Sequence, residues 1–208
     1  MRTGCWRIHY SRCMGDSHGV ELAQALGERG VPVQEITYSS CPPALNLKAK
    51  GDRPFCQRHN NQVFDYLVNN ASIETVVLAA YYGFPLSTSA DLQLHLADTA
   101  NALTAAGKRV VIVGPYVSID GHVDVPTHLA RGGDRKVPFE GDGMSVLRQR
   151  IGPSVQVVSP INIFCRDGYC DLIRDGLPLY FDAHHPSMHA SRAVARRVLP
   201  LISVGSNH

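Results

Sequence analysis

The chain has 208 residues and a formal net charge of +2, with 44% hydrophobic and 18% charged residues. This balance excludes a largely disordered chain, which would have fewer hydrophobic residues and a larger net charge. It also argues against nucleic acid as a partner, because phosphate binding needs a concentrated basic surface. We therefore expect one globular domain over residues 1–208.

The predicted elements alternate between helix and strand. A short apolar segment that ends at Met14-Gly15 precedes the first predicted helix. Helices are predicted from apolar residues spaced three or four apart, over residues 19–29, 57–69, 89–106, 143–151 and 187–199. Strands are predicted from short apolar runs, over residues 31–38, 75–82, 108–113 and 155–159. The Gly-, Pro- and Asp-rich residues 116–139 are expected to be irregular.

This alternation predicts a parallel sheet that helices cover on both faces. The expected fold class is α/β, a three-layer α/β/α sandwich with a flavodoxin-like sheet of about five strands. Functional residues of such sheets lie at the carboxyl ends of the strands. The sequence MGDSHG, residues 14–19, is expected at one such end.

Ser17 in MGDSHG is a candidate nucleophile. A serine hydroxyl needs a base to take its proton, and the base is usually a histidine that a carboxylate orients. Asp182 and His185 lie three positions apart just before the last predicted helix. The alternative is that Ser17 only caps a helix. For Asp16 we favour a structural role in the turn.

The cysteines bear on the compartment. Cys41 and Cys56 flank a Pro-rich stretch, and Cys165 and Cys170 flank CRDGYC, whose Asp-Gly pair favours a turn. Both pairs are candidate disulfides, which would favour an oxidising compartment, with a cytosolic protein and reduced thiols as the alternative. Of the remaining Cys5 and Cys13, we expect Cys13 to be buried beside the turn.

The chain offers no predicted membrane span. No apolar run approaches the roughly 18 residues that cross a bilayer. Its start, MRTGCWRIHYSRC, lacks the apolar core of a secretion signal, so any export signal would lie outside this chain.

A family resemblance adds to this interpretation. GDS at residues 15–17 and DAHH at 182–185 resemble the SGNH (GDSL-type) hydrolase family. The ordered series GDSH, CPP, TVVLAAYY, VVIVGPY, the pair Cys165 and Cys170, and PLYFDAHHPS resembles more closely the SGNH domain of membrane-bound acyltransferase-3 proteins. The likeness spans almost the whole chain.

The resemblance implies a periplasmic or otherwise extracytoplasmic domain that O-acylates, usually O-acetylates, envelope polysaccharides such as lipopolysaccharide. Ser17 would be the nucleophile, His185 the base and Asp182 its orienting acid. The partners would be an acyl donor, a polysaccharide acceptor and a membrane acyltransferase-3 domain in the same, longer protein. No cofactor is implied.

The oxyanion donors are less defined. SGNH enzymes commonly use a glycine and an asparagine besides the N–H of the serine, and this chain has Ala-Tyr-Tyr-Gly-Phe where the asparagine is expected. The loss of one such donor costs roughly 10²–10³ in rate, so a substitute is expected. The candidates are the N–H of Ser17, a backbone N–H near Ser40 or Gly83, and a tyrosine hydroxyl such as that of Tyr82.

Other interpretations stay open. His185 and His189 have the i, i+4 spacing of a metal site, but no nearby Glu or Cys completes a ligand set, so we expect no metal. His189 is expected on the surface of the last helix. A stand-alone carbohydrate acetylesterase would use the same triad with water as acceptor. A non-catalytic glycan-binding module on a degenerate hydrolase fold is the third hypothesis.

Overall fold

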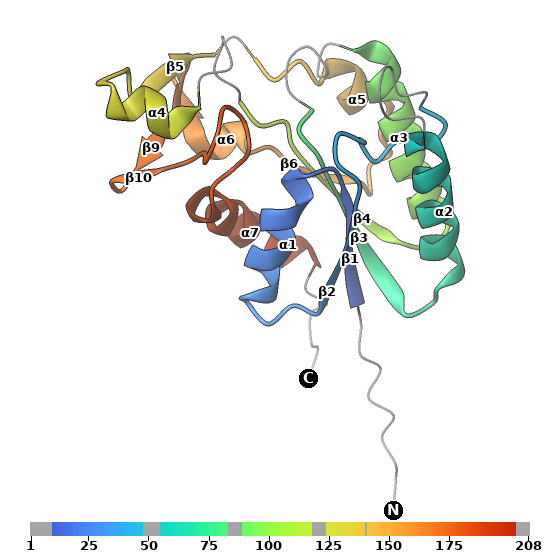
Figure 1. Cartoon of the computed structure of the whole chain (residues 1–208). Coiled ribbons are helices and arrows are strands. Elements are labelled where there is room, and N and C mark those ends of the chain that lie inside the picture. Colours follow the sequence, from blue (N-terminus) through green and yellow to red (C-terminus); the bar gives the residue numbers. More distant parts are fainter. Residues whose placement is uncertain (1–9, 48–54, 83–88, 118–123, 140, 203–208) are drawn as a thin grey trace, which may run out of the picture.

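The computed structural model describes residues 10–47, 55–82, 89–117, 124–139 and 141–202. Its centre is a sheet of five parallel strands in the order β2-β1-β3-β4-β6 (Figure 1). The strands are β1 (Tyr10–Gly15), β2 (Val33–Thr37), β3 (Ile73–Ala79), β4 (Arg109–Val113) and β6 (Gln156–Val158). This order is that of flavodoxin-like sheets, so the predicted fold class is confirmed.

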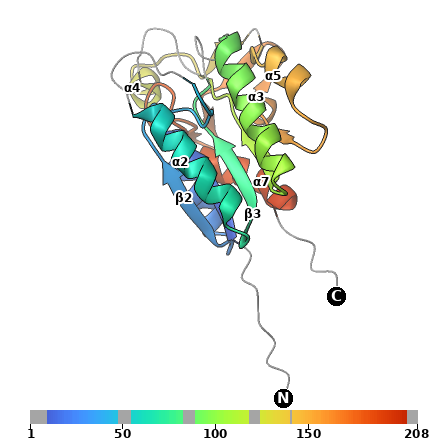
Figure 2. The same cartoon turned by 90° about the vertical axis from the view of Figure 1, so that its right-hand side faces the viewer.

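Helices cover both faces of the sheet (Figures 1 and 2). One layer contains α1 (His18–Gly27) and α7 (Met188–Ile202). The other layer contains α2 (Cys56–Asn69), α3 (Ala90–Ala105) and α5 (Ser145–Arg150).

Successive residues of a strand point to opposite faces of the sheet, so each central strand supplies both cores. Val77 and Val111 pack with α1 and α7, whereas Val76 and Ile112 pack with the helices of the other layer. This double burial explains why these strands read as continuous apolar runs in the sequence.

Two sequence predictions need correction. Residues 116–139 are not wholly irregular, because they contain α4 (Val125–Ala130) and β5 (Lys136–Pro138). The Asp124 side chain accepts a hydrogen bond from Thr127 N at 2.7 Å, which caps α4. The strand expected over residues 75–82 ends at Ala79. Sequence analysis also did not predict several short elements, which are α6 (Ile161–Phe164), β7 (Cys165–Arg166), β8 (Tyr169–Asp171), β9 (Ile173–Arg174) and β10 (Leu177–Pro178).

The described residues form two disulfides, Cys41–Cys56 and Cys165–Cys170. The second closes the hairpin of β7 and β8. Asp167 and Gly168 in its turn have φ of 53° and 77°, the left-handed values that a tight hairpin turn of type I′ requires. Cys13 is a buried free cysteine, as expected, and Cys5 lies outside the described residues.

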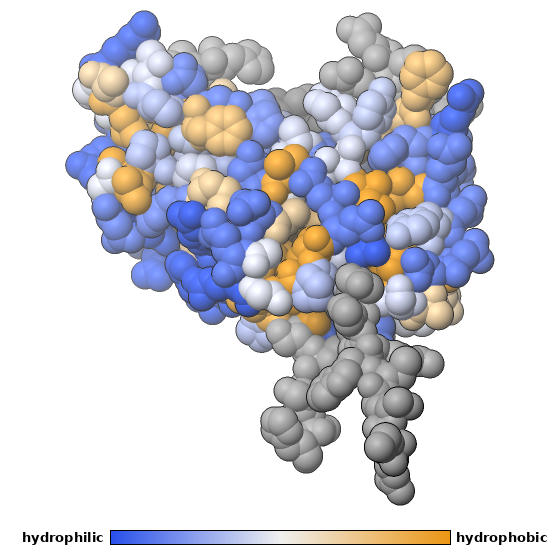
Figure 3. All heavy atoms as spheres, turned by 60° about the horizontal axis from the view of Figure 1, so that its bottom comes forward, coloured by the Kyte–Doolittle hydropathy of each residue, from blue (hydrophilic) through white to orange (hydrophobic). Residues whose placement is uncertain are grey.

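The strand register brings one edge of the sheet together. Gly15 pairs with Ala79, Ala79 with Val113 and Val113 with Val158, so the strands end side by side. The described chain begins and ends at the opposite edge (Figure 1). When that edge is turned forward, hydrophobic residues form small separate areas among hydrophilic ones (Figure 3). None of the described helices is both long and apolar enough to cross a bilayer.

Candidate active site

The turn between β1 and α1 presents Ser17 at the carboxyl edge of the sheet. Gly15 ends β1, and a Cβ at this position would overlap with the carbonyl oxygen of Ala79, so only glycine lets the two strands approach this closely. Helix α1 then begins at His18, directly after the serine. The tight turn therefore fixes where Ser17 leaves the sheet.

Ser17, His185 and Asp182 form a continuous hydrogen-bonded chain. Ser17 Oγ lies 2.7 Å from His185 Nε2, although 168 positions separate the two residues. On the other side of the ring, His185 Nδ1 lies 2.6 Å from Asp182 Oδ2. The His185 side chain is 19% exposed, so the ring is held by protein but open to a small molecule. This is the geometry of a serine nucleophile with a base and an orienting acid.

Asp182 is fixed by its own loop. Its Oδ1 accepts hydrogen bonds from the backbone N–H of His184 at 2.8 Å and of His185 at 2.6 Å. Partial burial acts to raise the pKa of Asp182, but these two bonds and the bond from the His185 ring outweigh it and lower the pKa to about 2. The carboxylate is therefore charged at every pH at which a histidine base works.

Backbone contacts close this loop on itself. Phe181 N donates to the carbonyl oxygen of His185 at 3.1 Å, and Ser187 N donates to that of Leu179 at 2.9 Å. Helix α4 adds an outside contact, because Val125 N donates to the Asp182 carbonyl oxygen at 3.0 Å. Asp182 and His185 are thus held as one rigid unit.

The helix-cap alternative for Ser17 does not match the geometry. Ser17 occupies the N-cap position of α1, but its side chain makes no capping hydrogen bond. Asp16 instead ties the turn together. Its Oδ1 accepts from His18 N at 2.9 Å, and its Oδ2 accepts from Tyr81 N at 3.1 Å. Asp16 therefore has the turn contacts expected of a structural residue, and the Ser17 hydroxyl is left for His185.

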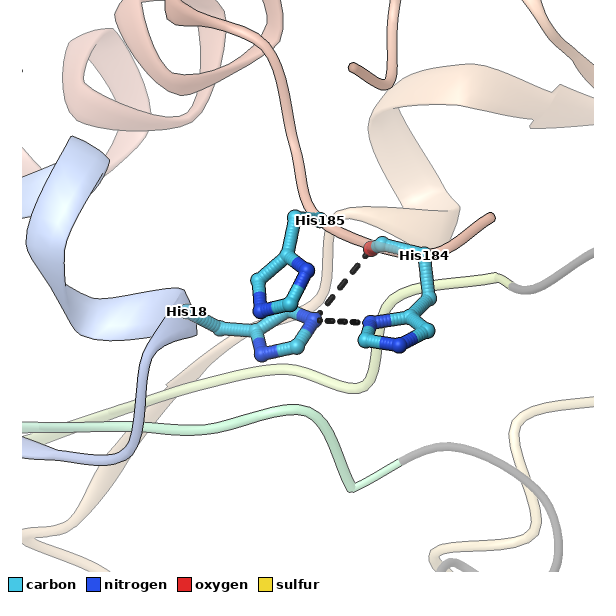
Figure 4. Close-up of side chains that lie close together, drawn as sticks. All are labelled: His18, His184 and His185. Atoms are coloured by element: carbon cyan, nitrogen blue, oxygen red, sulfur yellow. Dashed lines mark hydrogen bonds between the residues drawn. The ribbon is translucent and has the colours of Figure 1, made fainter. Parts of the chain in front are cut away.

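Two further histidines lie beside His185 (Figure 4). His18 is 1% exposed, and its ring stacks on that of His185 with centroids 4.2 Å apart and planes 19° apart. The His18 Nε2 atom lies 3.1 Å from His184 Nδ1 and 3.2 Å from the His184 carbonyl oxygen. Burial, together with His18 and His185, lowers the pKa of His184, which is therefore neutral near pH 7.

This histidine cluster has the residue types of a metal site, but its rings are poorly oriented for one. The three residues have ligand atoms within 4.8 Å of one another. A metal needs nitrogen lone pairs that converge on one point, and these lie in the ring planes. The His18 ring is stacked on those of His185 and His184 at 19° and 21°, whereas His184 and His185 are tilted by 40°. In addition, Asp182 and Ser17 already engage the two ring nitrogens of His185. His189 lies on α7 and faces Asp175 at 3.8 Å instead.

The oxyanion candidates differ in accessibility. Within the described part of the chain, the backbone N–H groups of Ser17 and Ser40 donate no hydrogen bond. Ser40 is exposed and has a left-handed φ of 57°. Tyr82 is wholly buried and its hydroxyl has no hydrogen-bond partner among the described residues, so that hydroxyl is not an accessible donor. Gly83 lies outside the described residues.

Sequence reasoning missed three members of the site. They are His18, the half-buried Tyr81, whose ring stacks on His18 at 5.0 Å, and the exposed Phe181, whose ring stacks on His185 at 5.4 Å. His18 carried a signal, because it follows the candidate nucleophile directly. Tyr81 belongs to the Ala-Tyr-Tyr-Gly-Phe segment that was expected near the oxyanion site, but its contact with His18 carried no signal and Phe181 carried none at all, since ring stacking depends on packing between distant segments.

The fold and this arrangement define an α/β domain with a serine, histidine and aspartate array at the carboxyl edge of its sheet. Residues 13–200 match the family model of the SGNH domain fused to AT3 domains, and the chain belongs to this family. It is thus an SGNH-type domain, a class of esterases and acyltransferases. No curated protein sequence matches the chain.

Solved structures support the same fold. The periplasmic domain of a lipopolysaccharide acetyltransferase from Salmonella ser. Paratyphi A is similar, with a TM-score of 0.69 and 16% identity over 93% of this chain and 83% of that one. A putative SGNH hydrolase from Slackia heliotrinireducens has a TM-score of 0.56 and 19% identity over 93% of this chain and 98% of that one.

Proposed function

We propose that the chain is a serine-dependent O-acyltransferase domain, acting as an O-acetyltransferase on hydroxyls of cell-envelope polysaccharide. The observation that carries the proposal is the 2.7 Å contact between Ser17 Oγ and His185 Nε2, with Asp182 on the far side of the ring. The family description adds the context of a membrane acyltransferase-3 domain. In this proposal, residues 1–208 are one catalytic domain of a longer, membrane-anchored protein.

The chemistry follows from the geometry in two half-reactions. Ser17 Oγ forms a bond to the acyl carbon while His185 Nε2 takes the hydroxyl proton. The acyl–oxygen bond of the donor then breaks, and His185 returns the proton to the leaving oxygen. In the second half, the acceptor hydroxyl gives its proton to His185 and attacks the acyl-serine. Ser17 leaves and regains the proton.

Asp182 and the backbone supply the electrostatics. The Asp182 carboxylate keeps the proton of the neutral ring on Nδ1, so Nε2 faces Ser17 as a base, and it stabilises the imidazolium that forms. The N–H groups of Ser17 and Ser40, which donate no hydrogen bond among the described residues, remain oxyanion candidates. The position of Ser17 at the start of the ten-residue helix α1 favours negative charge there.

The two disulfides and the similarity to a periplasmic domain support an extracytoplasmic location. The acceptor decides between the remaining hypotheses, because the same triad with water in place of a sugar hydroxyl is an esterase. A non-catalytic module would bind glycan without forming an acyl-serine.

The test is to incubate the chain with p-nitrophenyl acetate, with and without O-deacetylated polysaccharide. We expect nitrophenolate release, an acetyl group on Ser17 by mass spectrometry and acetyl transfer to the polysaccharide. Ser17→Ala should abolish all three, whereas Ser145→Ala, an exposed serine on α5, should abolish none. Turnover by Ser17→Ala at the unmutated rate would refute the nucleophile, and release of acetate without transfer would identify an esterase.

A further inference from the structure

His18 is the point at which the separate parts of the site meet. Its ring is buried and has ring neighbours after two strands: Tyr81 after β3 at 5.0 Å and Tyr116 after β4 at 5.7 Å. It also contacts the loop before α7, with His184 at 5.1 Å and His185 at 4.2 Å. A histidine that only filled space would not need partners from so many functional segments.

Both ring nitrogens of His18 have polar neighbours. Nδ1 lies 3.2 Å from Asp16 Oδ1, and a carboxylate can only accept, so Nδ1 carries the proton. Nε2 faces His184 (Figure 4): in a neutral ring with its proton on Nδ1 it accepts from the His184 ring, and in a ring with protons on both nitrogens it donates to the His184 carbonyl oxygen. In either state, His18 links the β1–α1 turn to the loop that holds His185.

The link acts on the plane of the His185 ring. That ring stacks with the rings of both His18 and Phe181, with interplanar angles of 19° and 12°. The hydrogen bond to Asp182 alone leaves the ring free to rock about the Nδ1 contact. The stacked rings of His18, which is buried, and Phe181 restrict this movement and so help to keep Nε2 aimed at Ser17.

We propose that His18 is a positioning residue for His185, and that the chain Asp16–His18–His184 holds the turn carrying Ser17 in register with the loop carrying the base. This inference rests on the proposed function, because it concerns the same triad. It predicts that the contact from His18 Nε2 to His184 matters for turnover apart from its contribution to folding.

The experiment compares three replacements of His18 in the whole chain. Leucine fills the space without either polar contact. Asparagine has an amide near the place of Nδ1 and keeps the Asp16 contact only. Glutamine can place its amide nitrogen near Nε2 and donate to the His184 carbonyl oxygen. His95→Leu is the matched control, since it also removes a histidine that faces an aspartate, Asp91 at 3.5 Å, but on α3 in the other layer.

The measurement is kcat with p-nitrophenyl acetate, divided by the number of serines that a fluorophosphonate probe labels when its reaction is run to completion, so that a slowly labelled serine is still counted. This division removes the effect of misfolded chains. We expect His18→Leu and His18→Asn to lower kcat per labelled serine by about 10–10²-fold with KM nearly unchanged, as for a small misplacement of a catalytic group. His18→Gln should recover most of the rate, and His95→Leu should match the parent.

The outcomes separate this inference from the proposed function. Turnover by Ser17→Ala at the unmutated rate would refute the triad itself. If Ser17→Ala is inactive but His18→Leu matches the parent per labelled serine, the triad stands and the positioning role is wrong. Recovery by asparagine but not glutamine would also overturn it, because the Asp16 contact alone would then suffice. If the leucine variant does not fold, the asparagine and glutamine pair still decides.

Discussion

Replacing Asp182 by asparagine tests the electrostatic arrangement of the site with almost no change of shape. In the structure, Asp182 Oδ1 accepts two backbone N–H groups and Oδ2 accepts the His185 Nδ1–H. An asparagine amide has one acceptor and one donor end. The two backbone donors need the acceptor, so the NH₂ group turns to Nδ1 of His185. The histidine must then accept there and carry its proton on Nε2, where it faces Ser17 as a donor.

The expected cost follows from this change of tautomer. A histidine with its proton on Nε2 cannot take the serine proton, and the loss in serine triads is on the order of 10⁴ in kcat. At 1.36 kcal/mol per factor of ten, that is about 5.5 kcal/mol of transition-state stabilisation. Folding should change far less, because the acceptor end of the amide keeps both backbone bonds.

The assay is p-nitrophenyl acetate turnover by Asp182→Asn, with Ser17→Ala as background and thermal unfolding as the control for folding. We expect a large loss of kcat with a melting temperature near that of the parent. Turnover within about tenfold of the parent by a folded Asp182→Asn chain would contradict this prediction, because the tautomer of His185 would then not depend on residue 182.

Two predictions concern the folded state itself. The pKa of Asp182 lies at about 2, below its usual 3.8, so the contribution of this carboxylate to stability is complete above about pH 4 and is lost as the pH falls through 2. The melting temperature of Asp182→Asn should therefore fall less than that of the parent between pH 4 and pH 2. An identical fall in the two proteins would contradict this prediction. Burial raises the pKa of the Cys13 thiol to about 12. Native Cys5→Ser protein should therefore not react with Ellman's reagent at pH 8, whereas unfolding in urea should expose one reactive thiol per chain. Prompt labelling of the native protein would show that the Cys13 thiol is accessible and would contradict this prediction.

The layers of the fold could be predicted because the burial that forms them requires apolar patterns that are visible in the sequence. Strands buried on both faces need continuous apolar runs, and Thr75 to Ala79 provides one. The small elements after Val117 could not be predicted in this way, since β5 and β8 pair across a long stretch of chain and bury little. The cap of α4 was present as Asp124 followed by Val-Pro-Thr, but the surrounding Gly and Pro residues masked it.

The candidate site shows a similar division. Ser17, Asp182 and His185 could be named from the sequence because each residue type has a required chemical role and the Asp-x-x-His spacing is local. Only the structure shows that the Ser17 Oγ atom lies 2.7 Å from the His185 Nε2 atom. The sequence also could not show that Tyr82 is buried and therefore not an accessible oxyanion donor, because no local pattern distinguishes a buried tyrosine hydroxyl from one that lines a site.

The distance from Ser17 to His185 depends on how α1 packs against α7, since the serine precedes the first helix and the histidine precedes the second. Leu22 and Leu26 of α1 lie in one buried cluster with Val194 and Val198 of α7. An ion pair between Glu28 and Arg192 also joins these helices, but it is exposed to water, where such pairs contribute little. The apolar contact therefore contributes more to the serine to histidine distance than the ion pair does, and it acts at the helices while the His18–His184 link acts at the turn and the loop. A cavity made there, by Val194→Ala for example, should lengthen that distance before it unfolds the domain, because the turn and the loop are each rigid in themselves.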